Sequence, residues 1–339
     1  MTTAIVPDIP LDRLPPVRAV TLSSAADLAR LVEAGRPAVA RGLVAGWPAV
    51  AAARAGPAAL NTYLKAMDRG LPGPVMEAPA TTGGRFGYAG DVREFSFTKR
   101  QRGVGETLDR IERGLGQPGA PVIAIQMLPL ATHLPPFTVD NPQPLLPGVA
   151  PLLWLGGAVR TQIHNDRDHN LACVVAGRRR FVLFPPEQVG DLYLGPLDNP
   201  PPLSLVDPEA PDLDRFPRFA NALAAAEVAE LAPGDALFMP RHWWHHVTSR
   251  DPYNAMVNYW WGGRSKGMDD PHAVFLAALL ALKDLPQAER RYWRAMVDAF
   301  VFGDGAAHLP PATRGVLGPL GPTQRAELRR RLKSIALLS

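Results

Sequence analysis

The sequence predicts a mainly β fold, an antiparallel sandwich or barrel with flanking helices and a helical segment at its C-terminal end. The chain has 339 residues, of which 47% are hydrophobic, so it can bury a large core. Its 37 prolines and 30 glycines lie mostly between apolar runs, a pattern typical of short strands joined by turns. The β-like runs are residues 121–127, 152–155, 171–175, 179–184, 236–239 and 254–261. Several short strands at this spacing favour a sandwich or barrel.

The N-terminal part is predicted to be a half-independent shell of helices and one strand. A serine, Ser23 or Ser24, can cap a short helix, which a buried strand over 38–44 and a helix over 57–67 should follow. Residues 72–105 are rich in Gly, Pro and Thr, so we expect them to be irregular.

The C-terminal part has a helical period. Residues 273–285 are apolar nearly all round, which predicts a helix buried on every side, and amphipathic helices are expected at 286–302 and 323–338. We therefore expect one domain at 1–262 and a helical region at 263–339. Its apolar surface favours pairing with a second copy, that is, a homodimer.

Several classes of protein are excluded by composition. No apolar run reaches the roughly 18 residues that span a bilayer. Asp8 and Asp12 stand where a signal peptide would need basic and apolar residues, so we expect a cytoplasmic protein. The single cysteine, Cys173, excludes a disulfide scaffold or a cysteine-based zinc cluster. Any metal must therefore be bound by histidine and carboxylate.

The basic charge does not predict a nucleic-acid partner. The net charge is +4 and the pI is near 9.4, but only five of the 36 basic residues are lysines, which points to genome composition. The densest basic runs, 178–180 and 329–331, are separate and lack interleaved aromatic residues.

A pair of metal-ligand residues, His164 and Asp166, is the strongest chemical signal. Residues two apart on a strand point the same way and lie about 6.6 Å apart along it, so both can reach one ion. The candidates for a third ligand are His242, His245 and His246. Two histidines and one carboxylate, with one face of the metal open, form the facial triad of non-haem Fe(II) oxygenases.

The distribution of histidines argues against a chance pair. Five of the eight fall within 164–169 and 242–246, each group beside a β-like run. His169 can act as a partner of the metal ligands or as a solvated turn residue, and the turn is favoured. The remaining three, His133, His272 and His308, are expected on the surface or in loops.

Two strands carry polar residues on faces where a pocket is expected. On 179–184, Arg179 shares a face with Phe181 and Leu183; if these point inward, the arginine does too, and it then needs an anion. The opposite register, with Arg178 and Arg180 inward, stays open.

The second strand is 254–261. One of its faces carries Asn254, Met256, Asn258 and Trp260, which fits a lined pocket or a solvent-facing stripe.

These residues together resemble the cupin-like JmjC group of 2-oxoglutarate oxygenases, particularly the branch containing the asparaginyl hydroxylase that acts on hypoxia-inducible factor. The matching segments are 161–166 with Asn170, 177–186, 233–247 and 257–260, and more loosely 36–48. His245 stands in the position of the last metal ligand, and the likeness covers residues 17–262.

The resemblance implies a double-stranded β-helix, or jelly roll, that holds Fe(II) through His164, Asp166 and His245. It implies 2-oxoglutarate as cosubstrate and hydroxylation of a C–H bond, with succinate and CO2 as coproducts. The residues expected to bind the cosubstrate are Thr161, Asn170, Arg179, Asn258 and Trp260. Because Thr161 lies three residues from His164, it needs a bulge to face inward.

Two positions differ from the family. Arg179 stands where the family usually has lysine, and residues 122–126 lack the tyrosine that the family often places there. The alternative function is therefore a metal-binding cupin without oxygenase activity that serves as a binding or scaffold protein. Demethylation of chromatin lysine is less favoured, because the chain has no reader module and no basic stripe.

The segments expected to choose the substrate are the irregular stretch 72–105, the segment 128–150 and the loop 187–232. A protein or peptide side chain is the family's commonest target, and a small molecule is the other class.

Overall fold

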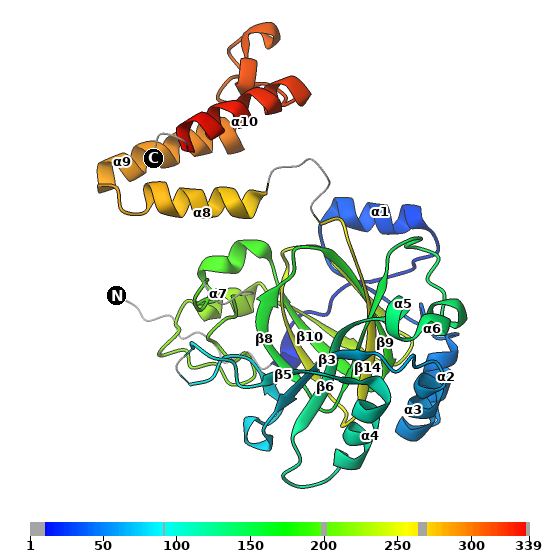
Figure 1. Ribbon diagram of the computed structural model, residues 1–339. Coiled ribbons are helices and arrows are strands. Elements are labelled where there is room, and N and C mark those ends of the chain that lie inside the picture. Colours follow the sequence, from blue (N-terminus) through cyan, green and yellow to red (C-terminus); the bar gives the residue numbers. More distant parts are fainter. Residues whose placement is uncertain (1–10, 91, 198–201, 264–269, 337–339) are drawn as a thin grey trace. The chain divides into compact units, whose positions relative to one another are not determined.

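The computed structural model describes residues 11–90, 92–197, 202–263 and 270–336 (Figure 1). The chain divides into two compact units, Met1–Gly263 and Arg264–Ser339. Each unit is described separately.

Two β-sheets build the first unit and confirm the predicted mainly β, jelly-roll architecture. The larger sheet has the order β1 (Ala19–Val20), β2 (Ala38–Ala40), β12 (Ala236–Met239), β9 (His169–Ala176), β14 (Asn254–Trp261), β7 (Pro151–Gly156), β6 (Val122–Pro129), β3 (Pro72–Ala78), β5 (Thr98–Gly103). The smaller sheet has the order β11 (Glu227–Leu231), β10 (Arg179–Phe184), β13 (Trp244–Ser249), β8 (Arg160–Asn165), β4 (Arg85–Phe86). Most pairs are antiparallel, and many of them join strands that are not consecutive in the chain, such as β9 with β12 and with β14.

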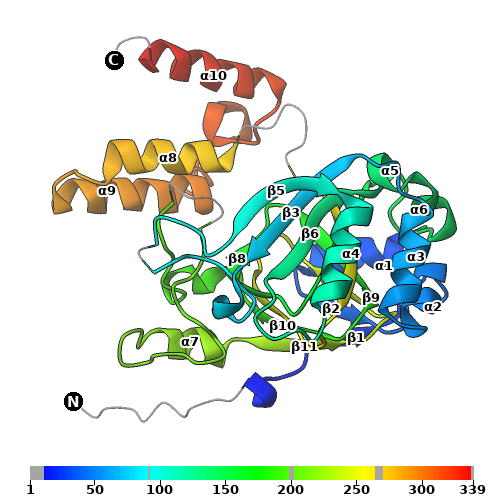
Figure 2. The ribbon, with the colours of Figure 1, turned by 60° about the horizontal axis from the view of Figure 1, so that its bottom comes forward.

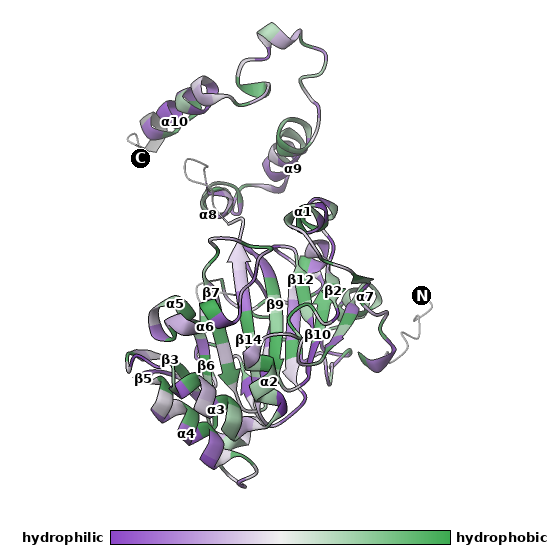
Figure 3. Cartoon of the chain, turned by 90° about the vertical axis from the view of Figure 1, so that its right-hand side faces the viewer, coloured by the Kyte–Doolittle hydropathy of each residue, from purple (hydrophilic) through white to green (hydrophobic). Residues whose placement is uncertain are grey.

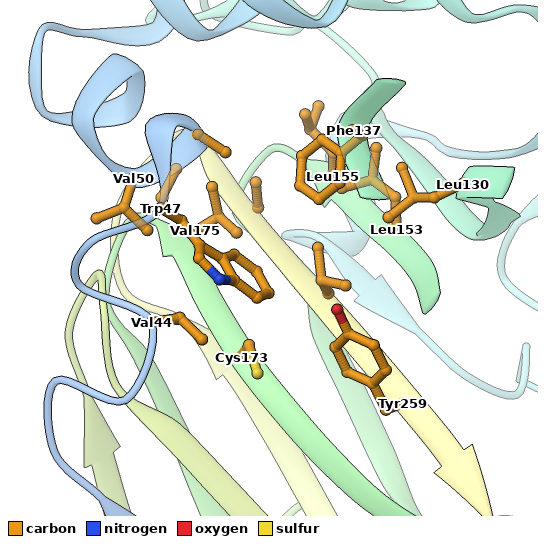
Figure 4. Close-up of a cluster of buried hydrophobic side chains, with 14 of the residues drawn as sticks. Val44, Trp47, Val50, Leu130, Phe137, Leu153, Leu155, Cys173, Val175 and Tyr259 are labelled. Atoms are coloured by element: carbon orange, nitrogen blue, oxygen red, sulfur yellow. The ribbon is translucent and has the colours of Figure 1, made fainter. Parts of the chain in front are cut away.

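A layer of helices covers one face of the larger sheet. These helices are α2 (Pro48–Arg54), α3 (Pro57–Lys65), α4 (Val104–Gly114), α5 (Leu130–His133) and α6 (Pro135–Asp140), and Figure 2 shows α4 beside β6. Their apolar residues form one buried cluster with the outward residues of β7, β9 and β14. In Figure 4, Trp47 and Phe137 lie in this cluster, with their ring centroids 6.2 Å apart. The same strands carry much of the hydrophobic colouring in Figure 3.

Because side chains alternate along a strand, the other face of the larger sheet points at the smaller sheet. On β9, Cys173 and Val175 face the helices, whereas Ala172 and Val174 join an apolar cluster with Phe181 of the smaller sheet. The space between the sheets is therefore lined by the alternate residues of both.

The predicted N-terminal helix forms as α1 (Ala25–Ala34). Ser24, rather than Ser23, is its N-cap, and Ser24 and Asp27 form a reciprocal capping box. Gly35 ends the helix with φ of 62°, a left-handed conformation that glycine adopts without strain. The predicted strand over 38–44 is shorter than expected, because β2 ends at Ala40 and a turn with Gly42 at φ 67° follows.

The prediction that 72–105 is irregular is wrong at both ends of the segment, whereas the described residues of 79–97 form mostly turns and bends. Two long strands, β3 and β5, extend the larger sheet there. Prolines normally argue against an inner strand, because they cannot donate a backbone hydrogen bond. In β3, however, β6 pairs only with Val75–Ala78, so Pro72 and Pro74 lie in the part of β3 that pairs with β5 alone.

Regular structure also occurs in the other two segments that were expected to choose the substrate, including the predicted loop 187–232. Residues 128–150 contain α5 and α6. Residues 187–232 contain part of a 3-10 helix (Pro186–Gly190), α7 (Phe219–Ala224) and β11. Shorter 3-10 helices occur at Leu11–Arg13 and Ala80–Thr82.

His133 is not the surface or loop residue that was expected. It ends α5 and is 7% exposed, and its ring nitrogens lie 3.1 Å and 3.2 Å from the carbonyl oxygens of Pro129 and Pro72. His272 and His308 are exposed, as predicted.

The second unit is helical, with α8 (Pro271–Leu282), α9 (Gln287–Val297), a π turn (Asp298–Phe302), two 3-10 turns (Pro311–Thr313 and Gly315–Leu317) and α10 (Pro322–Ala336). The expectation that residues 273–285 are buried on every side is wrong for this chain, because α8 has no buried residue and Leu280 is 89% exposed. The end of the predicted helix 323–338, residues 337–338, lies outside the described residues. No described helix is long and apolar enough to cross a membrane.

Candidate metal centre

Three side chains with metal-binding atoms converge at one end of the space between the sheets. His164 is the last residue but one of β8, and Asp166 follows that strand. His245 is the second residue of β13 and lies directly opposite His164. One ligand atom from each of the three lies within 4.8 Å of the others. The imidazole centroids of His164 and His245 are 4.3 Å apart, and Nε2 of His245 lies 3.8 Å from Oδ2 of Asp166.

Backbone carbonyls fix the orientation of both imidazoles. Nδ1 of His164 lies 2.8 Å from the carbonyl oxygen of Gln162, and Nδ1 of His245 lies 3.1 Å from that of Trp243. A carbonyl oxygen can only accept, so Nδ1 donates in each ring and Nε2 keeps its lone pair. The two lone pairs are therefore available to one ion, an arrangement that recurs in metal-binding histidines.

Burial keeps His245 in the form that binds metal. The residue is 4% exposed, and burial, with His164 close by, lowers the pKa of His245. Neutral imidazole is the metal-binding form, so no proton competes with a metal at neutral pH.

The other two candidate histidines do not join this group. His246 points to the opposite face of β13, where Nε2 lies 3.0 Å from Oγ1 of Thr248 and 3.7 Å from Oε1 of Glu209. His242 lies in the loop before β13, and its backbone N–H donates to the carbonyl of Asp166 at 2.9 Å. His242 thus helps to hold the loop that carries the carboxylate.

A pocket opens from these three residues into the space between the sheets. The five residues expected to bind a cosubstrate all line it, namely Thr161, Asn170, Arg179, Asn258 and Trp260. The structure therefore brings all eight predicted site residues to one pocket. Their roles in binding remain predictions.

Arg179 is a buried cation for which the described part of the chain offers no ion pair. It lines the pocket and is 8% exposed, and its Nε has no hydrogen-bond partner among the described residues. Burial alone lowers the pKa of Arg179 to about 10, still well above neutral pH. Its neighbours point away: Arg178 pairs with Asp251 at 2.7 Å, and Arg180 pairs with Asp12 and Glu230. The register that places Arg179 inward is therefore the one that forms.

The bulge that Thr161 requires is present. His245 pairs with His164 and Val247 with Thr161, so two residues of β8 stand opposite the single residue His246. Thr161 and His164 consequently face the same pocket although they are three residues apart. Oγ1 of Thr161 accepts from the backbone N–H of Val247 at 3.1 Å, which leaves its hydroxyl proton for the pocket.

The polar face of β14 lines the pocket, and the solvent-stripe alternative is wrong. Nδ2 of Asn258 donates to Oδ1 of Asn170 at 3.0 Å. Within the described part of the chain, Oδ1 of Asn258 and Nε1 of Trp260 have no partner. Asn254 is buried but lies outside the pocket lining, and its amide donates to the carbonyl of Asp251.

His169 is not a solvated turn residue. It begins β9, is 7% exposed and accepts a hydrogen bond from the backbone N–H of Arg241 at 3.2 Å. Its ring packs against Phe238 and Trp261. Burial, followed by the charge of Arg241, lowers the pKa of His169, so the neutral ring supports the loop between β12 and β13.

Two further residues of the pocket were not predicted from the sequence. Trp154 and Gln126 line it, from β7 and β6. The alternation in 152–155 could have indicated Trp154. Leu153 and Leu155 face the helices, so Trp154 between them must point to the other face of the strand, toward the pocket.

Glu209 was also not predicted, because it lies in a segment read as a loop. It accepts from Thr248 Oγ1 at 2.7 Å and from Arg160 Nη1 at 2.8 Å, so it ties this segment to β13 and β8. His246 first, and then Arg160 and Thr248, hold the pKa of Glu209 well below its usual range.

Comparison with known proteins gives the family. The sequence profile of the cupin-like domain matches residues 24–267. HSPB1-associated protein 1 of Homo sapiens is 42% identical over 112 residues, which are 32% of this chain and 22% of that protein. Lysine-specific demethylase JMJ31 of Arabidopsis thaliana is 39% identical over 110 residues, 32% of this chain and 20% of that protein. Jumonji C domain-containing protein 5 of Drosophila melanogaster is 34% identical over 109 residues, 32% of this chain and 26% of that protein.

The matching segment thus spans about a quarter or less of the length of these relatives, whereas the family profile spans most of this chain. The fold, the facing histidines and the profile agree, and the chain belongs to the cupin-like domain family of JmjC type.

Proposed function

We propose that this protein is an Fe(II)- and 2-oxoglutarate-dependent hydroxylase that acts on a protein or peptide side chain. The observation that carries the proposal is the buried guanidinium of Arg179, whose Nε has no hydrogen-bond partner among the described residues, in the same pocket as two histidines and one carboxylate. A metal-binding group alone fits many cupins. A buried cation beside it calls for an anionic ligand that also reaches the metal.

The donor set fits Fe(II). Two imidazole nitrogens and one carboxylate oxygen on one side of an ion leave open positions, which is the arrangement used by non-haem Fe(II) oxygenases. Fe(II) bound there would supply the redox chemistry that couples oxidative decarboxylation of 2-oxoglutarate to hydroxylation of a C–H bond. His164, Asp166 and His245 would hold the ion, and the carbonyls of Gln162 and Trp243 orient the two rings.

The shape of the pocket fits a 2-oxo acid with a second carboxylate. Arg179 pairs with Ser249, four residues further along β13 than His245, so the cation lies on the deep side of the metal group. The guanidinium binds the distal carboxylate there, and Thr161 donates its hydroxyl proton to the same group. Asn258 and Trp260 line the pocket where β14 pairs with the start of β9, at Ala172 and Asn170.

A relative named as associated with HSPB1 favours a protein as substrate or partner. The asparaginyl-hydroxylase branch, the cytoplasmic location and a homodimer through the C-terminal helices rest on the sequence alone. The alternative, a metal-binding scaffold protein without oxygenase activity, predicts no use for a buried cation, so we rank it second.

The proposal is tested by measuring succinate formed from 2-oxoglutarate by the iron-loaded protein. Replacing His164 with alanine should abolish succinate formation and leave the fold intact, as checked by circular dichroism. His308→Ala is the matched control, since this exposed histidine lies in the other unit and its loss should change nothing. A folded His164→Ala protein with undiminished succinate formation would contradict the proposal.

A further inference from the structure

Besides Arg179 and Trp260, the pocket holds another donor without a partner among the described residues, and it belongs neither to the metal group nor to the predicted cosubstrate residues. Trp154 of β7 lines the pocket, and its Nε1 is buried without a hydrogen-bond partner in the described ranges. The indole N–H can donate but cannot accept. A buried donor left unsatisfied costs about as much as a lost hydrogen bond, so this N–H indicates a missing acceptor.

The register of the strands places Trp154 deep in the pocket. Trp154 pairs with Met256, which lies four residues along β14 from Trp260, away from the metal end. Arg179 is displaced in the same sense on the opposite sheet, four residues from His245. Trp154 and Arg179 therefore approach the deep part of the pocket from facing sheets. Trp260 lies nearer the metal end, with its ring centroid 6.0 Å from that of Trp154.

The hydrogen-bond donors in the deep part of the pocket favour a carboxylate as the bound group. Arg179 and Trp154 each offer N–H groups there, and the hydroxyl of Thr161 adds a third donor. A carboxylate oxygen accepts several hydrogen bonds and also neutralises the guanidinium. A methyl or amide group in its place would leave the charge unpaired.

We propose that Trp154 is a cosubstrate-binding residue, whose indole N–H donates to the distal carboxylate that Arg179 holds. This inference rests on the proposed function, since it assumes a 2-oxo acid bound at the metal. It assigns to Trp154 a role in distinguishing dicarboxylates from monocarboxylates.

The test compares two ligands that differ only at the distal end. 2-Oxopentanoate has a methyl group where 2-oxoglutarate has the distal carboxylate, and both can chelate a metal. Their affinities are measured by isothermal calorimetry on Zn(II)-loaded protein, which does not turn over. Trp154→Phe keeps an aromatic ring and removes the N–H. The substitution should weaken the affinity for 2-oxoglutarate about tenfold or more, the size expected for the loss of a hydrogen bond to a charged group. The affinity for 2-oxopentanoate should change less than about twofold.

Trp47→Phe is the matched control. Its indole also donates when buried, to the carbonyl of Pro142, but it lies in the helix-covered core on the other face of the sheet. Both affinities should stay at their wild-type values. An equal loss for both ligands in Trp154→Phe would show a structural role and overturn the proposal, as would an unchanged preference for 2-oxoglutarate.

A second readout uses the wild-type protein. With ¹⁵N-labelled tryptophan, the indole N–H signal of Trp154 should move downfield with 2-oxoglutarate and not with 2-oxopentanoate; Trp154→Phe or Trp154→Tyr assigns the signal. A signal that does not move while 2-oxoglutarate binds overturns the role of Trp154 alone. Failure of the wild-type protein to bind 2-oxoglutarate overturns the proposed function as well.

Discussion

Replacing Arg179 with methionine is predicted to stabilise the ligand-free protein while weakening cosubstrate binding. The side chain is 8% exposed, and burial lowers the pKa of Arg179 to about 10, roughly 2.5 pKa units below the usual arginine value. At about 1.4 kcal/mol per pKa unit, the unpaired charge costs on the order of 3 kcal/mol. Methionine keeps much of the apolar stem without the charge. The variant should therefore recover part of this free energy.

Differential scanning calorimetry of the Zn(II)-loaded protein measures both effects. A gain of about 1–3 kcal/mol raises the Tm by several degrees in a chain of this size. Saturating 2-oxoglutarate, at about 100 times its Kd, should stabilise the wild type by about 2.7 kcal/mol and the variant far less.

Arg180→Met is the matched control for this prediction. The guanidinium of Arg180 already pairs with Asp12 and Glu230, so its removal should not stabilise the protein. The reasoning is refuted if Arg179→Met melts below the wild type and still gains the full stabilisation from 2-oxoglutarate.

Three other predictions follow from the contacts. Glu209→Gln should lower the free energy of unfolding by about 1–3 kcal/mol at neutral pH, because Arg160, Thr248 and His246 surround the carboxylate. Since the pKa of Glu209 is lowered in the folded state, this contribution is present above the unfolded pKa of about 4.3 and is lost as the pH falls below that value. Urea titrations that give the same difference in free energy of unfolding between wild type and variant at pH 7 and at pH 3 would contradict this. Cys173 is fully buried, and burial raises its pKa to about 12, so iodoacetamide should alkylate it at pH 8 only in denaturant; rapid native labelling would be inconsistent with its place in the core. If the exposed apolar α8 pairs with a second copy, sedimentation should show a dimer that becomes a monomer when residues 264–339 are removed; a monomeric full-length chain would argue against pairing.

Much of the site was predictable because its residues repeat with the period of a strand. The alternation of Arg179 with its neighbours follows directly from strand geometry. The two-residue spacing brings His164 and Asp166 together although Asp166 lies just beyond the end of β8. Thr161 needed one further condition, a bulge, and β8 contains it.

Other features depend on long-range contacts that a local pattern does not contain. The strand β3 contains two prolines, and it forms because β5 and β6 flank different lengths of it. His169 resembles a turn residue until Phe238 and Trp261 pack against its ring. The donor role of Trp154 is visible only once the facing sheet places Arg179 in the same pocket.

The central claim, that the pocket binds a metal-chelating 2-oxo acid, is tested most directly by anaerobic titration of the iron-loaded protein with 2-oxoglutarate. The account predicts a visible metal-to-ligand charge-transfer band, which is lost in His164→Ala and weakened in Arg179→Ala. If iron is bound and no band forms, the protein is not a 2-oxoglutarate oxygenase, and the metal-binding scaffold becomes the better account of this pocket.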